Sequence, residues 1–103
     1  MDWNKSKLLD FLRHHTQEEI ILEEQGGTLR FQGKLQDVVE LNLCSNTLFE
    51  AELVPAIMGT EISLTFHDTF LGINILARSA ETEEPLISCS AQIPYEKLLI
   101  SLH

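Results

Sequence analysis

Basic side chains are scarce in this sequence. It holds 7 Lys and Arg residues against 16 Asp and Glu residues, so its formal net charge at pH 7 is −9. Because affinity for nucleic acids comes largely from Lys and Arg that neutralise phosphates, we expect no binding to DNA or RNA. An acidic surface favours solubility and basic partners, although a solvated acidic surface without any partner is the more common meaning of such a charge balance.

Long apolar runs are also missing. The longest, such as residues 20–22 and 98–100, are far shorter than the roughly 20 residues that span a bilayer. The first residues lead into only a few apolar ones before Arg13, His14 and His15 interrupt them, which is not the pattern of a signal peptide. We therefore expect no membrane insertion and a cytoplasmic location.

Cysteine and catalytic motifs are sparse. Cys44 and Cys89 belong to no CxxC or Cys/His cluster, so we expect buried, reduced thiols in apolar strands. The sequence holds no G-x-S-x-G, P-loop, G-x-G-x-x-G or H-E-x-x-H motif. His67 and Asp68 could act as an acid and a base, but they fall at a predicted hairpin turn, where both residue types are common for conformational reasons. We predict no catalytic residue, no metal site, no cofactor and no enzymatic activity.

The sequence begins with a short amphipathic segment. Residues 5–15 carry apolar side chains at helical spacing, with Asp2 or Asn4 as the candidate N-cap. The apolar face consists of Leu8, Phe11 and Leu12. A second helix is predicted over residues 95–102, because Pro94 suits the start of a helix.

Between these two segments the apolar period changes to two, which is typical of strands. The alternating segments are residues 19–23, 29–36, 39–43, 61–67, 73–78 and 87–93. Turns are predicted at residues 25–28 and 68–69, and an exposed acidic hairpin loop at residues 79–85. We therefore predict a mostly β fold in one domain, residues 1–103: a small antiparallel split barrel, or a sandwich, of about six strands with a short helix at each end.

The alternation also predicts the core, because it buries one face of each strand. The expected core residues are Leu29, Phe31, Leu41, Leu43, Ile62, Leu64, Phe66, Ile73, Ile75, Ile87 and Ile93. Gly33 falls on the apolar face of its strand, which predicts a bulge or a bend.

Residues 45–58 break the alternation and contain Pro55. We predict a loop, with a single helical turn around residues 49–53 as an option. The loop holds five apolar candidates for a protein contact: Leu48, Phe49, Leu53, Val54 and Ile57. They either cap the open end of the barrel, as most apolar loop residues do, or form a patch for a protein partner or for self-association.

Four segments carry a family resemblance: L-L-x-F-L at residues 8–12, T-L-R-F-Q-G-K-L-Q-D-V at 28–38, G-T-E-I-S-L-T-F at 59–66 and A-Q-I-P-Y-E-K-L-L at 91–99. Their order resembles the N-terminal, YcgR-N type domain that precedes a PilZ domain in bacterial flagellar-brake proteins. The resemblance implies a bacterial protein linked to motility or cyclic di-GMP signalling. In that family an Arg-x-x-x-Arg linker follows and binds the phosphates of the dinucleotide, whereas the last fifth of this sequence supplies only Lys97. The resemblance therefore implies a stand-alone relative that contacts proteins without binding the nucleotide.

The expected function is thus that of a non-enzymatic regulatory or protein-interaction domain. The alternative is a small acidic inhibitor or immunity protein that masks a basic partner, since the charge of −9 would steer the two together. A third hypothesis is that the chain is a subunit of an enzyme. An inhibitor would bind one basic partner tightly with a salt-sensitive on-rate, whereas a signalling domain would bind more weakly.

Overall fold

A computed structural model describes residues 2–44, 46–78 and 85–103. Within these residues the chain forms one α-helix, one 3-10 turn and a sheet of eight strands. The elements are α1 (Lys5–Arg13), β1 (Glu19–Glu24), β2 (Arg30–Leu35), β3 (Val39–Leu43), β4 (Asn46–Val54), β5 (Thr60–Phe66), β6 (Phe70–Arg78), β7 (Pro85–Pro94), η1 (Tyr95–Lys97) and β8 (Leu98–Leu102).

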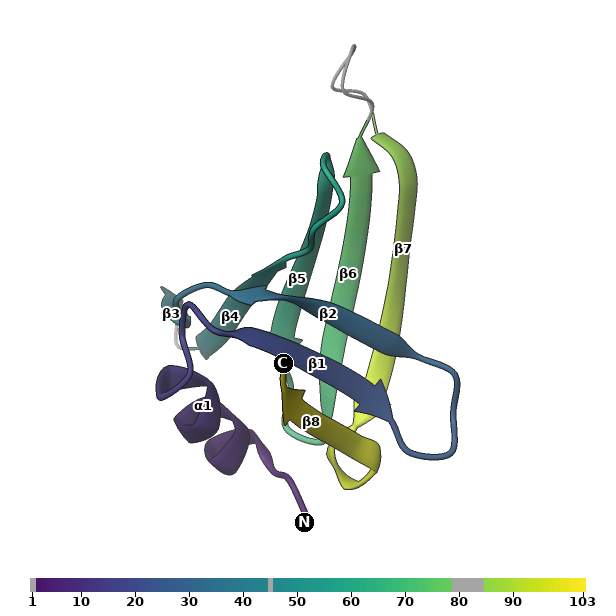
Figure 1. Ribbon diagram of the computed structural model, residues 1–103. Helices are drawn as coiled ribbons and strands as arrows, with labels where there is room; N and C mark the ends of the chain where they lie inside the picture. The colour runs from purple at the N-terminus through teal and green to yellow at the C-terminus, as the bar shows by residue number, and fades with distance from the viewer. Residues whose placement is uncertain (1, 45, 79–84) are drawn as a thin grey trace.

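All the strand pairs are antiparallel, in the order β7-β6-β5-β4-β2-β1-β8, and β3 pairs with β4 beside this path. The sheet curls, so that β1, β2 and β8 cross over β5, β6 and β7 and enclose the core between the two halves (Figure 1). The predicted mostly β, antiparallel, barrel-like architecture is confirmed. The predicted number of about six strands is too low.

Helix α1 packs on the core through one face, as its sequence pattern predicts. Leu8 and Leu12 are fully buried and Phe11 is partly buried against the core. Asn4, and not Asp2, is the N-cap, since its side-chain Oδ1 accepts a hydrogen bond from the Lys7 N–H at 2.8 Å. A helix this short is unstable alone, and its burial against the sheet supplies the missing stability.

The predicted C-terminal helix is wrong. After the η1 turn the chain becomes strand β8, which pairs with β1 in a register that sets Ile20 opposite Leu102 and Glu24 opposite Leu98. β2 pairs with one edge of β1, and without β8 the backbone groups of the other edge would be exposed. The pairing of β8 with this edge outweighs the short helical pattern at residues 95–102.

The predicted loop at residues 45–58 is also wrong in its first part, because β4 occupies most of it. Ala51 and Leu53 are buried while Glu50 and Glu52 are exposed, so the second half of β4 alternates as a strand does. The adjacent apolar pair at residues 48–49 hides this period, since the first half of β4 has apolar side chains on both faces.

The core is larger than the alternation predicts. Of the expected core residues, Phe31, Ile62, Leu64, Phe66, Ile73 and Ile93 are buried, and Leu29 and Ile75 are partly buried against them. Buried residues beyond that prediction include Leu9, Ile20, Leu22, Leu35, Leu53, Leu71, Tyr95 and Leu98. Ile87 is a wrong prediction: it is 59% exposed, and it lies near the N-terminal end of β7. Leu41 is partly buried away from the core, and the side chain of Leu43 lies outside the described residues.

Gly33 marks the close approach of β2 to β4. A Cβ at this position would lie 3.0 Å from the carbonyl carbon of Val54 and 3.1 Å from the Cβ of Leu53. The predicted turns at residues 25–28 and 68–69 are present, and Gly26 supports the first with a φ of 76°. The predicted loop at residues 79–85 lies outside the described residues except for Pro85, where β7 begins.

Both cysteines are free and exposed, which corrects the expectation of buried thiols. Cys44 follows β3 at the tip of the β3–β4 hairpin with a φ of 56°. Cys89 lies in β7, which has a neighbour on one side only among the strands that the structure describes. Strand alternation identifies the face on which a cysteine lies, but it does not reveal whether another element covers that face.

Candidate protein-interaction surface

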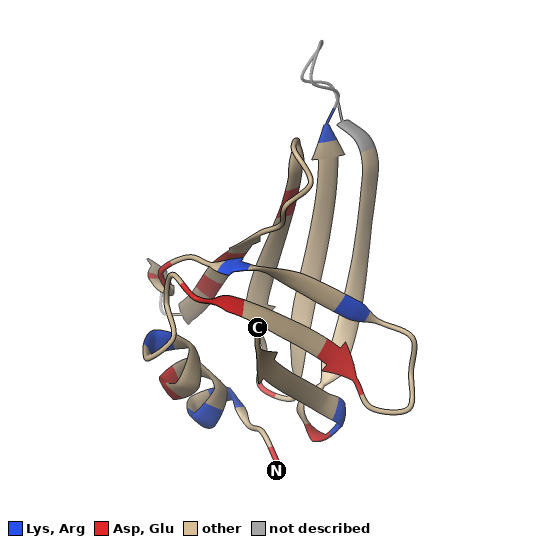
Figure 2. Ribbon diagram, viewed as in Figure 1, with Lys and Arg blue, Asp and Glu red and all other residues tan. Residues whose placement is uncertain are grey.

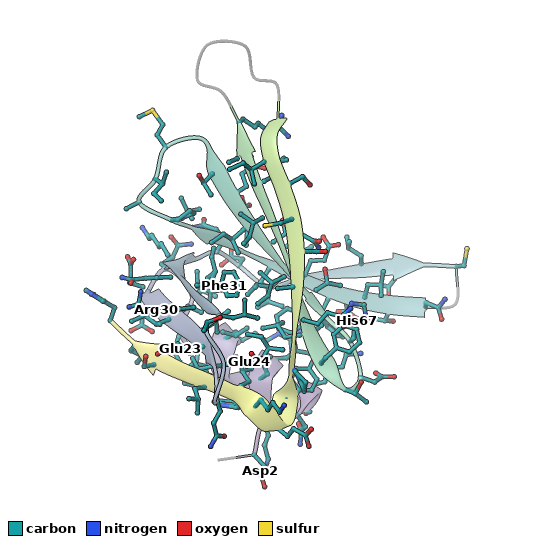
Figure 3. All side chains as sticks on the ribbon, turned by 90° about the vertical axis from the view of Figure 1, so that its right-hand side faces the viewer. Asp2, Glu23, Glu24, Arg30, Phe31 and His67 are labelled. Atoms are coloured by element: carbon teal, nitrogen blue, oxygen red, sulfur yellow. The ribbon has the colours of Figure 1, made fainter. Side chains whose placement is uncertain are left out.

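The β3–β4 hairpin extends away from the body of the protein. Within the described part of the chain β3 pairs only with β4, in a register that sets Val39 opposite Glu50 and Leu41 opposite Leu48. Figure 3 shows the two strands as a pale blue ribbon that reaches outward from the curled sheet. Such a ribbon presents two faces, one toward α1 and one toward solvent.

The solvent face of this hairpin carries an apolar strip, which consists of Val39, Leu41 and Leu48. Opposite residues of an antiparallel pair share a face, which places all three side chains together with Glu50. Val39 is 49% exposed, and the half-buried pair of Leu41 and Leu48 is not among the side chains that pack against the core. The core therefore does not account for these three side chains.

A shallow groove of about 370 Å³ lies at the base of this strip. Its lining residues are Gln36, Asp37, Val39, Glu50, Ala51, Glu52 and Ser63. Glu50 and Glu52 have alternate positions on β4 and so share the solvent face, and Figure 2 shows the acidic segments of β4. Among the described residues, no Lys, Arg or His forms an ion pair with Asp37, Glu50 or Glu52. The groove is therefore a site of negative potential beside an apolar strip.

The structure does not bring the five predicted contact residues together. Leu48 lies on the solvent face of the hairpin, whereas Leu53 is fully buried in the core, where no partner can reach it. Val54 and Ile57 are exposed at the end of β4 and beyond it. Sequence reasoning missed Val39 as a surface residue and assigned Leu41 to the core, because alternation alone does not show that β3 continues past the edge of the core.

Phe49, the remaining candidate, lies on the face of the hairpin toward α1. Its ring packs against the core, with Lys5 Nζ at 5.6 Å and Arg13 Cζ at 5.4 Å from the ring centroid. Cations over an aromatic face are attracted by the ring quadrupole. This contact connects the hairpin to both ends of the helix, which favours the capping role for Phe49.

The His67–Asp68 turn is held by structural contacts. The His67 ring stacks on Phe70 at 4.3 Å between centroids, and the Tyr95 hydroxyl donates a hydrogen bond to the His67 carbonyl at 2.5 Å. Burial, together with the negative charge of Asp68, raises the pKa of Tyr95 to about 12. Asp68 is 3.4 Å from Lys5 Nζ. His67 and Asp68 thus both serve the turn and its attachment to the rest of the fold.

A second hollow lies beside α1. It is about 470 Å³ in volume and is lined by Trp3, Lys7, Asp10, Phe11, His14 and His15. Of its two histidines, His15 has its Nδ1 2.5 Å from Glu18 Oε2 and its ring centroid 4.3 Å from that of Phe11. Across residues 2–44, 46–78 and 85–103, no group of three or more His, Cys, Asp or Glu side chains is arranged to hold a metal ion.

The chain matches no protein-family model, no curated protein and no solved structure. The resemblance to the YcgR-N type domain therefore stays a prediction from the sequence. In the part of the chain that the structure describes, no helix has the length and apolar character needed to cross a membrane.

Proposed function

We propose that this chain is a non-enzymatic protein-interaction domain, and that the solvent face of the β3–β4 hairpin binds a basic segment of a partner protein. The observation that supports this most strongly is the apolar strip of Val39, Leu41 and Leu48, which the core does not use and which borders a groove with three carboxylates. Exposed apolar side chains with a polar rim are typical of protein contacts.

The chemistry of the groove favours arginine in the partner. A guanidinium group can bind a carboxylate such as Glu50 or Glu52 through two parallel hydrogen bonds, while its apolar stem lies along neighbouring aliphatic side chains. In a partner segment with an arginine next to a Leu or Ile, the arginine would bind the carboxylates of the groove while the aliphatic side chain packs on the apolar strip. A regulatory domain would use this contact reversibly, and the YcgR-N resemblance would place it in bacterial motility or cyclic di-GMP signalling.

The same surface also supports the alternative of an acidic inhibitor. The charge of −9 would speed the approach of a basic protein, and this steering weakens as salt screens the charges. The two functions differ in affinity. A nanomolar complex with one basic protein indicates an inhibitor, whereas a micromolar, rapidly exchanging complex indicates a signalling domain.

The experiment compares three forms of the full chain in a quantitative pull-down from the native host. The test form carries Glu50→Gln and Glu52→Gln, and the matched control carries Asp2→Asn and Glu96→Gln, which remove the same charge from exposed positions away from the groove. We expect a partner that the wild type and the control retain and the test form loses. With that partner purified, the test form should bind at least about tenfold more weakly. Equal binding by all three forms would show that this face is not the one used.

A further inference from the structure

β7 is an edge strand without the usual protection. Among the described strands its one neighbour is β6, with which it pairs from Phe70–Pro94 to Arg78–Pro85. Figure 1 shows β7 as the outermost strand of its half of the sheet. Exposed edges normally carry charged residues or an internal proline that prevents pairing with another chain, yet β7 holds no charged residue and its prolines are at its two ends.

The alternation of hydrogen bonds along β6 shows which backbone groups of β7 have no partner in β6. The His67 N–H donates to the Phe70 carbonyl and the Arg78 N–H to the Gly59 carbonyl, so the even-numbered residues of β6 bond to β5. The odd-numbered residues of β6 therefore bond to β7, where their register partners include Cys89 and Ala91. The backbone groups of Ser88, Ser90 and Gln92 consequently point to the open edge.

The side chains of β7 divide by chemistry between its two faces. Ile87, Cys89 and Ala91 share the face of the buried Ile93, and both Ile87 and Cys89 are exposed there. Ser88 and Ser90 lie exposed on the opposite face. The segment from Ile87 to Ala91 therefore has the same chemical pattern in both directions, apolar-Ser-Cys-Ser-apolar.

We propose that a second copy of this chain pairs antiparallel with β7 across a two-fold axis at Cys89, so that the sheet continues from one copy into the other. In this register Ser88 lies opposite Ser90 of the second copy, and their outward backbone groups exchange hydrogen bonds. On one face of the sheet the side chain of each Ile87 contacts Ala91 of the other copy. On the other face the hydroxyl group of Ser88 lies opposite that of Ser90. Shifting the register in either direction sets unlike side chains opposite one another.

Charge is the reason for choosing a second copy as the occupant. Two chains of −9 repel one another, so they associate best through a surface that adds no carboxylates to the contact. β7 is such a surface, because residues 85–94 are uncharged in a chain of which 22% is charged. Salt screens the remaining repulsion, so the dimer should become tighter as salt rises. Binding of a basic partner to the hairpin should instead become weaker as salt rises, so the salt dependence distinguishes the two proposals.

Sedimentation equilibrium over a concentration series tests the dimer and its register. Ser88→Lys combined with Ser90→Lys sets ammonium groups opposite one another twice, and it should raise the dimer dissociation constant about tenfold or more. Ser88→Glu combined with Ser90→Lys sets opposite charges together in the proposed register alone, and it should restore association to within about threefold of the wild type. All these positions are exposed, so both variants should melt as the wild type does.

Thiol cross-linking gives a second, independent readout. Opposite residues whose backbone groups point away from each other have Cα atoms about 4.5 Å apart, within the range of a disulfide. Oxidised glutathione should therefore join two Cys89 thiols into one disulfide and leave two molecules of reduced glutathione. The Cys44→Ser variant keeps only Cys89 and should form the covalent dimer far faster than the Cys89→Ser variant, whose Cys44 is also exposed.

Three results would overturn the proposal. One is a wild-type chain that stays monomeric up to millimolar concentration at high salt. Another is association that the pair of lysine substitutions leaves unchanged. The third is failure of the Glu/Lys combination to associate better than the Lys/Lys combination, which would exclude the proposed register.

Discussion

At the scale of single residues, Tyr95 connects the start of η1 to the β5–β6 turn. Its side chain is 4% exposed, and its hydroxyl donates to the backbone carbonyl of His67. This hydrogen bond requires the protonated phenol, because the phenolate has no proton to donate. The protonation of Tyr95 is therefore linked to the stability of the fold.

We predict that stability falls as the pH rises from 10 to 12. The pKa of Tyr95 in the folded chain is about 12, raised by burial from its ordinary value of 10.0. Below pH 10 both states keep the proton, so the contribution of Tyr95 is fully present, and above it the unfolded chain alone begins to lose the proton. Urea unfolding at several pH values measures this loss. The Tyr95→Phe variant should lose about 1 kcal/mol at neutral pH and should lack the wild type's additional decline above pH 10.

Leu64 and Ile87 show that a position in an alternating strand segment does not by itself determine whether a side chain is buried. Leu64 is fully buried and Ile87 is exposed, although both lie in alternating strand segments. Leu64→Ala should lower the free energy of unfolding by about 2–5 kcal/mol, since it removes buried methyl groups and leaves a cavity. Ile87→Ala should change it by less than about 0.5 kcal/mol in dilute solution. Denaturant titration checks both, and equal losses would contradict the assignment of Ile87 to the surface.

At the scale of elements, the contact between α1 and the hairpin depends on Phe49. Lys5 and Arg13 lie over its ring from the two ends of α1. Phe49→Ser should lower the melting temperature by several degrees, because partly buried aromatic area and two cation–π contacts are lost. Val54→Ser is the matched control on the same strand, and its exposed side chain should leave the melting temperature nearly unchanged.

An opposite outcome would revive the patch interpretation of Phe49. If Phe49→Ser leaves the melting temperature unchanged but abolishes association with a partner or with a second copy, then Phe49 serves the contact and not the fold. If neither property changes, both interpretations of this residue are wrong. Circular dichroism at 222 nm, which follows the one helix of the described chain, records any loss of α1 directly.

The elements that sequence reasoning predicted well are those with a clean period. α1 carries its apolar residues at helical spacing, and β5 around Leu64 alternates between buried and more exposed residues, so their faces could be assigned. β4 was missed because its first half has apolar residues on both faces of a projecting ribbon. β8 was missed because its pairing with β1 comes from residues far apart in the sequence, and no local pattern reveals it. The groove between Asp37 and Glu52 was missed for the same reason.

At the scale of the whole molecule, the charge balance predicts that cyclic di-GMP does not bind. The two phosphates of this ligand require fixed cationic groups, and Lys5 and Arg13, two of the seven Lys and Arg residues, are engaged with the Phe49 ring. Calorimetric titration in the micromolar range should show no saturable heat. Clear saturable binding would contradict this prediction and would point to a small-molecule function.

The pairing of β1 with β8 has a consequence for how the chain folds. Ile20 reaches its partner Leu102 only after nearly all the intervening sequence is in place. Contacts between residues so distant along the chain must close a long loop before they stabilise anything, and folds dominated by such contacts form slowly. A nascent chain emerging from a ribosome would hold β1 with one edge bare for most of its synthesis. We therefore expect the open edge of β1 to be accessible to chaperones during synthesis. In a refolding experiment, the β1 amides that bond to β8 should become protected from hydrogen exchange later than those that bond to β2.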